Sequence, residues 1–272
     1  MVRRVALISD SGSDLDSGIL ASLGITAIPL EADLAQAEAS LPYEPSFDVA
    51  DERLTVALIS AYENAAAAGM ESIVSVHMSS QMAGAFHAAR AARHRLRGVL
   101  PIEVIDTGLA GIALGFVVQR AARFAAEGAT ASQVAQLVRR SARNVHTMIF
   151  AESLSNVRSS PRWMRDYAGQ ISGNGTRPIL SVEDGDLRPL ERVRTRARGY
   201  DRLAEFVELF PHVDALAIYH DAPPTELESL LQRIGPVYPR ERIIFGSYGP
   251  TLRSRLGSRA IGVFVDQGLN AD

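Results

Sequence analysis

The stretch Ile73-Val74-Ser75-Val76-His77-Met78-Ser79-Ser80-Gln81-Met82-Ala83-Gly84-Ala85-Phe86 decides the fold. Residues 73–78 are mostly β-branched or apolar, which is typical of a buried strand. Two serines, Ser79 and Ser80, follow directly, and a helix is predicted from about residue 83 to 97, where Gly98 ends it. Hydroxyls at a strand's carboxyl end, beside the free N–H groups of a new helix, favour the binding of an anion.

The segments on both sides of this stretch repeat the alternation of strand and helix. Strands in βαβα order that are joined by helices predict a parallel sheet with helices on both faces. We expect strands at about 5–9, 25–30, 102–105 and 147–151, and helices ending at about 23, 68, 126 and 143.

The pattern changes after Glu152. Residues 153–175 are polar and rich in helix and strand breakers, and the segment 179–193 predicts a hairpin turning at Asp184-Gly185. Further strands and helices follow without the regular alternation, which favours an α+β arrangement. We therefore predict an α/β protein of two domains, an N-terminal α/β domain at 1–155 and a C-terminal α+β domain at 156–272.

The composition is that of a globular protein, and it excludes several chemistries. The 272 residues are 47% hydrophobic and 22% charged, with a formal net charge of -3, so no nucleic-acid partner is indicated. There is no cysteine, and all 28 basic residues are arginine. Thiol nucleophiles, disulfides, lysine Schiff bases and a phosphate-loop lysine are therefore excluded.

No run of apolar residues reaches the length that spans a bilayer, about 18 residues. The longest candidate, 109–126, carries Gln119, Arg120 and Arg123. The N-terminal apolar run is too short for a signal peptide. We expect a cytoplasmic protein without integral membrane insertion.

Three predicted strand ends carry hydroxyl or carboxylate groups: Asp10-Ser11-Gly12, Ser79-Ser80 and Asp106-Thr107-Gly108. Each set is also explained as an ordinary helix cap. Because parallel strands end on one edge of their sheet, the three sets are alternatively expected to face one crevice. The two aspartates would repel a phosphate there, which favours a singly charged carboxylate.

Three other hypotheses remain open. His87 and His94 lie on one helix face, but no carboxylate follows at metal-ligand spacing, so the metal hypothesis is weak. A serine hydrolase or acyl-transfer enzyme could be assembled from Ser79 or Ser80, a histidine and Asp10, although no Gly-x-Ser-x-Gly elbow is present. The arginines could instead form a solvated surface or a docking face for a partner; they are Arg188, Arg192, Arg194, Arg196, Arg198 and Arg202, with Arg253, Arg255 and Arg259.

Several of these segments together resemble the DegV family of fatty-acid-binding proteins. Residues 8–15 are similar to the family's opening strand and Asp-Ser turn, and 79–86 to its Ser-Ser-x-Leu-Ser-Gly-Thr-Tyr motif. Further similar segments are Ile28-Pro29-Leu30, Val104-Ile105-Asp106-Thr107, Arg177-Pro178-Ile179-Leu180, Asp184-Gly185 and Arg192-Val193-Arg194-Thr195-Arg196.

The resemblance implies a two-domain carrier with a long-chain fatty acid buried between the domains. It implies no catalysis of its own and no cofactor; some members present the acyl chain to a separate fatty acid kinase subunit, which phosphorylates the carboxylate. The resemblance further implies that hydroxyls at the Ser-Ser strand end and a threonine from an earlier loop hold the carboxylate. The ligand-binding candidates are Ser79, Ser80, Thr55, Asp10, Ser11, Thr107, Gly84 and Arg255.

This sequence departs from the family pattern at the proposed site. The Thr-Ser-x-Pro-Ser motif is not recognisable, and Thr55 is the nearest threonine. Ala83 and Ala85 replace a serine and a threonine of the motif, and Arg255 lies where the family has a histidine near the C-terminus. A degenerate member that acts only through a protein partner therefore remains an alternative.

Overall fold

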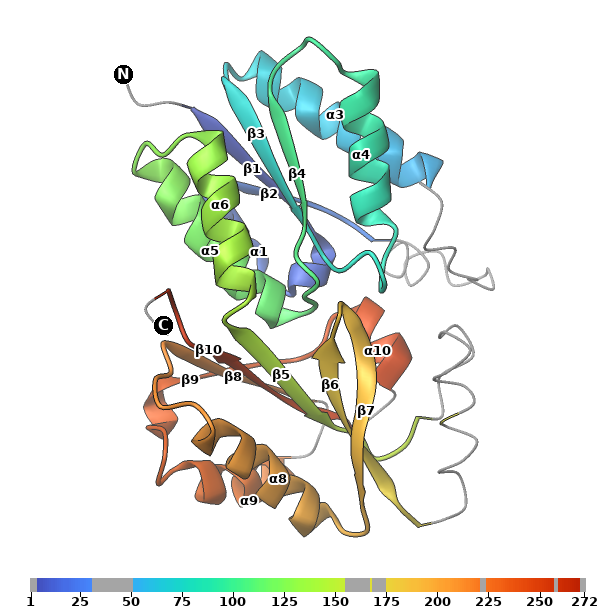
Figure 1. Ribbon diagram of the computed structural model, residues 1–272, viewed down its shortest axis with the longest axis vertical. Helices are drawn as coiled ribbons and strands as arrows, with labels where there is room; N and C mark the ends of the chain where they lie inside the picture. Colours follow the sequence, from blue (N-terminus) through green and yellow to red (C-terminus); the bar gives the residue numbers. More distant parts are fainter. Residues whose placement is uncertain are drawn as a thin grey trace. The chain divides into compact units, whose positions relative to one another are not determined.

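The computed structural model describes residues 4–30, 51–154, 167, 175–220, 224–256 and 259–269. By its internal contacts the chain forms two compact units (Figure 1). The first is Met1–Arg143 together with the turn Asp184–Asp186, and the second is Asn144–Glu183 with Leu187–Asp272. Among the described residues, no helix is both long and apolar enough to cross a bilayer.

The first unit is built on a four-stranded parallel sheet in the order β2-β1-β3-β4 (Figure 1). Helices α3 and α4 cover one face, and α1, α5 and α6 cover the other. The predicted parallel sheet with helices on both faces is confirmed. The elements are β1 (Val5–Asp10), a 3-10 turn (Ser11–Ser13), α1 (Ser17–Leu23), β2 (Ile25–Ile28), α3 (Glu52–Ala67), β3 (Ser72–His77), α4 (Ala85–Arg95), β4 (Ile102–Asp106), α5 (Ile112–Ala126) and α6 (Ala131–Ala142).

The central strand β3 is buried from Ile73 to its last residue, as its apolar sequence predicts. Helix α3 begins at the cap Asp51, whose carboxylate accepts from the N–H groups of Arg53 and Leu54. Its buried positions Leu54, Leu58 and Tyr62 recur every fourth residue and pack into one core with the sheet. Burying such a side chain stabilises a fold by about 1.5–3 kcal/mol, so this stripe fixes α3 against the sheet.

The second unit is built on a six-stranded mixed sheet in the order β7-β6-β5-β10-β8-β9. Within this sheet, β10 runs antiparallel to β5 and β8, and β5 runs antiparallel to β6, whereas β8 and β9 are parallel. Helices α8 and α9 pack their apolar side chains against the sheet in one core. The elements are β5 (Val145–Phe150), β6 (Arg177–Glu183), β7 (Asp186–Val193), α8 (Arg196–Glu208), β8 (Ala215–His220), α9 (Pro224–Ile234), a 3-10 turn (Arg240–Arg242), β9 (Ile243–Gly246), α10 (Pro250–Leu256) and β10 (Ile261–Asp266).

The predicted hairpin is present, and its turn chemistry explains it. Asp184 and Gly185 both have positive φ, at 50° and 80°, which is the backbone of a type I′ turn between β6 and β7.

The placement of strand 147–151 in the first sheet is wrong. The corresponding strand β5 pairs antiparallel with β6 and β10, so it belongs to the second sheet. The division of the chain therefore falls after Arg143, earlier than the expected boundary near residue 155. Helix α10, at Pro250–Leu256, was not predicted.

Candidate functional site

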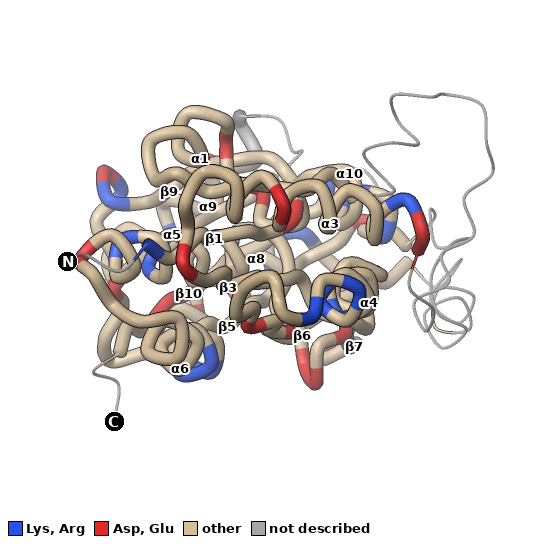
Figure 2. Tube along the Cα trace, turned by 90° about the horizontal axis from the view of Figure 1, so that it is seen from above, with Lys and Arg blue, Asp and Glu red and all other residues tan. Residues whose placement is uncertain are grey.

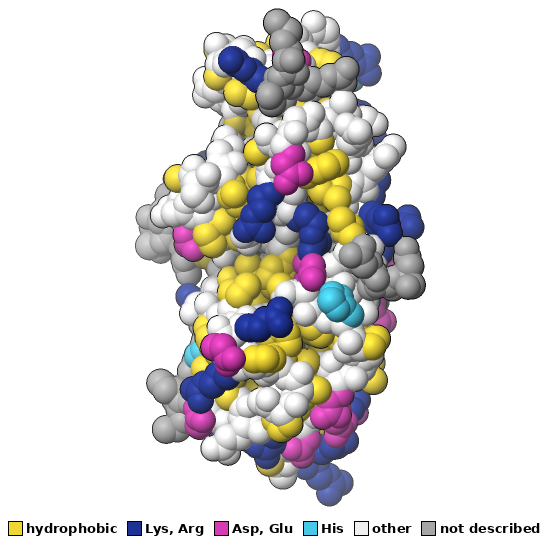
Figure 3. All heavy atoms as spheres, turned by 90° about the vertical axis from the view of Figure 1, so that its left-hand side faces the viewer, with side chains coloured by type: hydrophobic (Ala, Val, Ile, Leu, Met, Phe, Trp, Pro, Cys, Tyr) yellow, Lys and Arg dark blue, Asp and Glu magenta, His cyan; other side chains and the backbone are white. Residues whose placement is uncertain are grey.

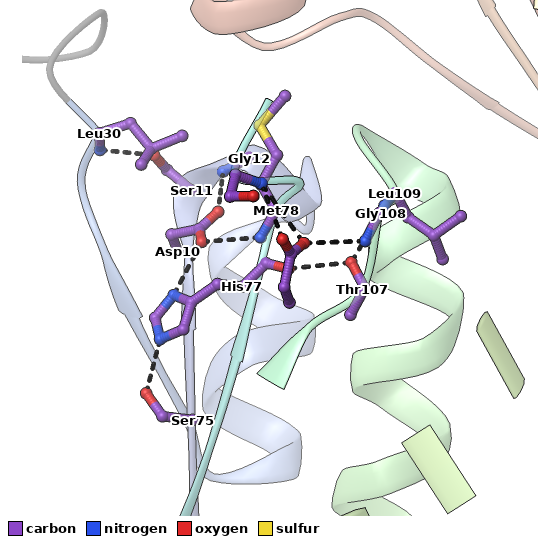
Figure 4. Close-up of polar contacts among 12 residues, drawn as sticks. Asp10, Ser11, Gly12, Leu30, Ser75, His77, Met78, Thr107, Gly108 and Leu109 are labelled. Carbon is purple, nitrogen blue, oxygen red and sulfur yellow. Dashed lines mark hydrogen bonds and ion pairs between the residues drawn. The ribbon is translucent and has the colours of Figure 1, made fainter. Parts of the chain in front are cut away.

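The carboxyl ends of β1, β3 and β4 lie side by side at one edge of the parallel sheet (Figure 4). This brings the three predicted sets of polar residues together: Asp10-Ser11-Gly12, Ser79-Ser80 and Asp106-Thr107-Gly108. Most of their polar atoms bind other parts of the chain, and these bonds fix the backbone of the edge.

The Asp10 carboxylate joins the end of β1 to the end of β3. One oxygen accepts from Gly12 N at 3.0 Å, and the other accepts from Met78 N at 3.0 Å and lies 3.0 Å from His77 Nδ1 (Figure 4). Both Asp10 and His77 have no exposed surface. Three donors satisfy this buried carboxylate, so Asp10 is a structural clamp rather than a group that faces a ligand.

A chain of buried hydrogen bonds continues from His77 toward helix α3. The second ring nitrogen, Nε2, lies 2.7 Å from Ser75 Oγ, and the Tyr62 hydroxyl donates to that oxygen at 2.8 Å. Because a carboxylate only accepts, His77 carries its proton on Nδ1, and Nε2 accepts from Ser75. Burial raises the pKa of Tyr62 to about 12, against the opposing effect of its hydrogen bond with Ser75.

The end of β4 is joined to the end of β3 in the same way. Thr107 Oγ1 donates to the His77 carbonyl at 2.9 Å and accepts from Leu109 N at 3.1 Å (Figure 4). The Asp106 carboxylate accepts from Gly108 N at 3.0 Å and, at 3.3 Å, from Ser80 N. Asp106 and Thr107 are therefore backbone clamps as well.

The two serines differ in what their hydroxyls contact. Ser79 is buried; its hydroxyl donates to the carbonyl of Gly185 and accepts from Gln81 N at 3.2 Å. Ser80 is half-buried, and within the described part of the chain its hydroxyl makes no hydrogen bond. Of the two serine hydroxyls, that of Ser80 is therefore the one without a partner among the described residues.

The N-terminus of α4 lies directly after these serines. Gly84 is its cap residue and offers no side chain to the first N–H groups of the helix. Those groups have no partner within a helix and attract anions. Ala83 and Ala85, at the motif's hydroxyl positions, leave this end bounded by buried methyl groups.

The other predicted residues lie elsewhere or are already bonded. The buried Thr55 hydroxyl donates to the Asp51 carbonyl at 2.7 Å, and Ser11 Oγ accepts from Leu30 N at 2.9 Å. Arg255 is 4% exposed and lies on α10 of the second unit.

The hydrolase arrangement built on Ser79 or Ser80 does not form. The serine that faces His77 and Asp10 is Ser75, which has no exposed surface and already accepts from Tyr62. Its order of contacts matches a Ser-His-Asp triad, but a nucleophile must reach its substrate.

The metal hypothesis also finds no support among the described residues, which contain no group of three metal-ligating side chains. His87 and His94 instead line a groove of about 670 Å³ along α4, with Arg90, Arg93 and Arg97. Figure 2 shows the basic positions of this helix.

Arg192, Arg194 and Arg196 do not share a strand face, because β7 ends at Val193 and Arg196 begins α8. Several of these arginines are ion-paired. Glu152 binds Arg177 and Arg196, each at 2.8 Å. Burial alone would raise the pKa of Glu152, but these two arginines outweigh it and hold that pKa below its ordinary value. Figure 3 shows acidic and basic side chains interspersed on one face of the molecule.

The sequence did not single out Tyr62, Ser75 and His77 as partners. One signal was present, since Ser75 and His77 alternate within an apolar strand and so point to the same face. Nothing in the sequence connects Tyr62 with them, because that contact depends on how α3 packs.

The sequence model of a protein family, described as "Uncharacterised protein, DegV family", matches residues 54–267 of this chain. A DegV domain-containing protein of Mycobacterium tuberculosis is 32% identical over 78% of this chain and 77% of its own. Two solved structures share the fold over 97% of this chain. A DegV family protein from Corynebacterium glutamicum matches over 98% of its own chain, with a TM-score of 0.81 and 21% identity. A DegV family protein from Thermus thermophilus, described by its fatty acid binding, matches over 99% of its own chain, with a TM-score of 0.76 and 19% identity. The chain therefore belongs to the DegV family.

Proposed function

We propose that this protein binds a long-chain fatty acid and that the carboxylate is held by the Ser80 hydroxyl and the first N–H groups of α4. The observation that carries the proposal is the start of α4, which no side chain caps and which follows Ser80 closely in the chain; the Ser80 hydroxyl makes no hydrogen bond within the described chain. A helix N-terminus and a neutral hydroxyl suit a singly charged head. The fatty acid binding described for the Thermus thermophilus relative supports the same ligand class.

The energetics favour a ligand with a long tail. Burying an acyl chain contributes about 0.8 kcal/mol per methylene. A carboxylate that receives several hydrogen bonds loses only part of its hydration energy, so the tail supplies most of the affinity.

The direct experiment is mass spectrometry of an organic extract of the purified protein, with thermal shift on adding palmitate or oleate. We expect a co-purifying fatty acid and a higher melting temperature. Absence of both would refute the proposal.

The head-group assignment has its own test. We expect Ser80→Ala to weaken fatty-acid binding by about tenfold, the effect of losing one hydrogen bond to a charged group. Ser60→Ala, on the solvent-exposed side of α3, is the matched control and should bind as the wild type does. Equal affinity of the Ser80 variant and the control would refute the role of Ser80 but not fatty-acid binding.

We further propose that the protein is a carrier without catalysis, which presents the acid to a separate ATP-dependent kinase. Transfer of the γ-phosphoryl group of ATP to the carboxylate would give an acyl phosphate and ADP. The purified protein with oleate and ATP should form no acyl phosphate, measured as hydroxamate after adding hydroxylamine. It should also resist labelling by a fluorophosphonate probe, because Ser75 is buried; rapid labelling would favour the hydrolase instead.

A further inference from the structure

The buried chain Tyr62–Ser75–His77–Asp10 spans the first unit from helix α3 to the strand ends, and the proposed function makes no direct use of it. All four residues have no exposed surface. They come from three elements, since Tyr62 lies on α3, Ser75 and His77 on β3, and Asp10 on β1. Burying this many polar groups is costly unless every one is satisfied.

With a neutral histidine and an ionised carboxylate, the donors and acceptors of the chain fit a single direction of hydrogen bonding. Tyr62 donates to Ser75, Ser75 donates to His77 Nε2, and His77 Nδ1–H donates to Asp10. In this arrangement the histidine is neutral and the carboxylate is ionised. Each hydroxyl and ring nitrogen has its partner, so the chain is directional and rigid.

The chain ends at the backbone that leads into Ser79 and Ser80. The Asp10 oxygen that faces His77 also accepts from Met78 N, while the His77 carbonyl accepts from both Thr107 N and Thr107 Oγ1. Ser79 N donates to the Leu109 carbonyl at 2.8 Å. Successive peptide groups from His77 to Ser79 are therefore held from both neighbouring strands.

We infer that Tyr62, Ser75 and His77 are positioning residues of the head-group site, which act through Asp10 to fix the backbone that presents Ser80 and the start of α4. The inference rests on the proposed function. The groups that contact a ligand must be held in place by hydrogen bonds to neighbouring residues. Loss of such a neighbour typically weakens binding even though no ligand contact is removed.

The first experiment reads the proton arrangement in the unliganded protein. We expect nitrogen NMR of histidine-labelled protein at pH 7 to show one neutral imidazole with its proton on Nδ1, and that signal to disappear in His77→Gln. A His77 signal with the proton on Nε2, or with both nitrogens protonated, would overturn the directional chain. This result does not depend on whether the protein binds a fatty acid.

The second experiment measures oleate affinity in a series of variants along the chain. We expect the loss of affinity to grow toward Asp10: less than about twofold for Tyr62→Phe and about tenfold for Ser75→Ala and His77→Gln. Ile73→Val, on the same face of β3 and fully buried, is the control; it lowers stability without changing a polar contact. Melting temperatures ensure that each affinity is measured on folded protein.

The outcomes separate the two proposals. Wild-type protein without oleate affinity would refute the proposed function. Wild-type affinity together with unchanged affinity in Ser75→Ala and His77→Gln would refute the positioning role alone. The positioning role would also be refuted if the loss of oleate affinity were proportional to the loss of melting temperature in every variant, including Ile73→Val.

Discussion

Asp10→Asn tests how much of the first unit depends on one carboxylate. The substitution preserves shape but replaces one acceptor oxygen with an NH₂ donor. The remaining oxygen can serve either Gly12 N or the pair Met78 N and His77 Nδ1, but not both sides. In one orientation of the amide the N–H of Gly12 loses its acceptor, and in the other the N–H of Met78 does.

The expected cost follows from these contacts. A lost hydrogen bond to a charged group and a buried donor left unsatisfied each cost about 1–3 kcal/mol, so we expect a loss of about 3 kcal/mol. For a urea m value of about 2 kcal/mol/M, this lowers the midpoint by roughly 1.5 M. Asp106→Asn is the control: its carboxylate is half-buried, and its bonds to Ser80 N are long, at 3.3 Å, so about 1 kcal/mol is expected.

The assay must report on the first unit, because two units need not unfold together. Hydrogen exchange monitored by mass spectrometry in peptides covering 5–14 and 72–79 provides this. A loss below about 0.5 kcal/mol for Asp10→Asn, or one no greater than that of Asp106→Asn, would refute the clamp role of Asp10.

Three further predictions concern pH and packing. The pKa of Tyr62 is raised to about 12, so the contribution of its neutral hydroxyl to the free energy of unfolding is complete below pH 10 and is lost as pH rises toward 12. The free energy of unfolding, measured as a function of pH, should show this loss in the wild type and not in Tyr62→Phe. The pKa of Glu152 is lowered, so the contribution of its ionised carboxylate to the free energy of unfolding is present above pH 4.5 and is lost as pH falls through the pKa of the folded state. The free energy of unfolding of Glu152→Gln should therefore fall less steeply with acid than that of the wild type, and identical curves would contradict the prediction. A Cβ at Gly115 would lie 2.6 Å from the Ser13 carbonyl oxygen, so Gly115→Ala should lower the free energy of unfolding by about 1–3 kcal/mol by urea titration, whereas the exposed Gly18→Ala should not.

The parallel sheet could be predicted because its strands and helices follow local rules. Strand β3 is apolar and bounded by serines, and the β6–β7 hairpin turns at the Asp-Gly pair that a type I′ turn needs. Strand β5 was assigned to the wrong sheet, because its apolar sequence does not specify whether its neighbour is β4 or the distant β10.

The edge that carries the candidate site was also predictable, but the roles of its residues were not. Placing Asp10, Ser79 and Thr107 at strand ends requires only the order of elements. Which of their oxygens bind backbone N–H groups depends on the packing of neighbouring loops. The sequence therefore placed the three strand ends together, but it did not show that most of their polar groups are bonded within the chain.

The position of β10 in the second sheet has a consequence for folding during synthesis. This strand lies between β5 and β8, and Asp266 pairs with Val145 as well as with Ala215. Every other strand of that sheet emerges from the ribosome earlier, so two partial sheets with unpaired edges wait for β10 to join them. Such edges invite aggregation, and long-range pairing is slow. The second unit is therefore the part of this protein that we expect to need chaperones, whereas the strands of the first are all made by residue 106.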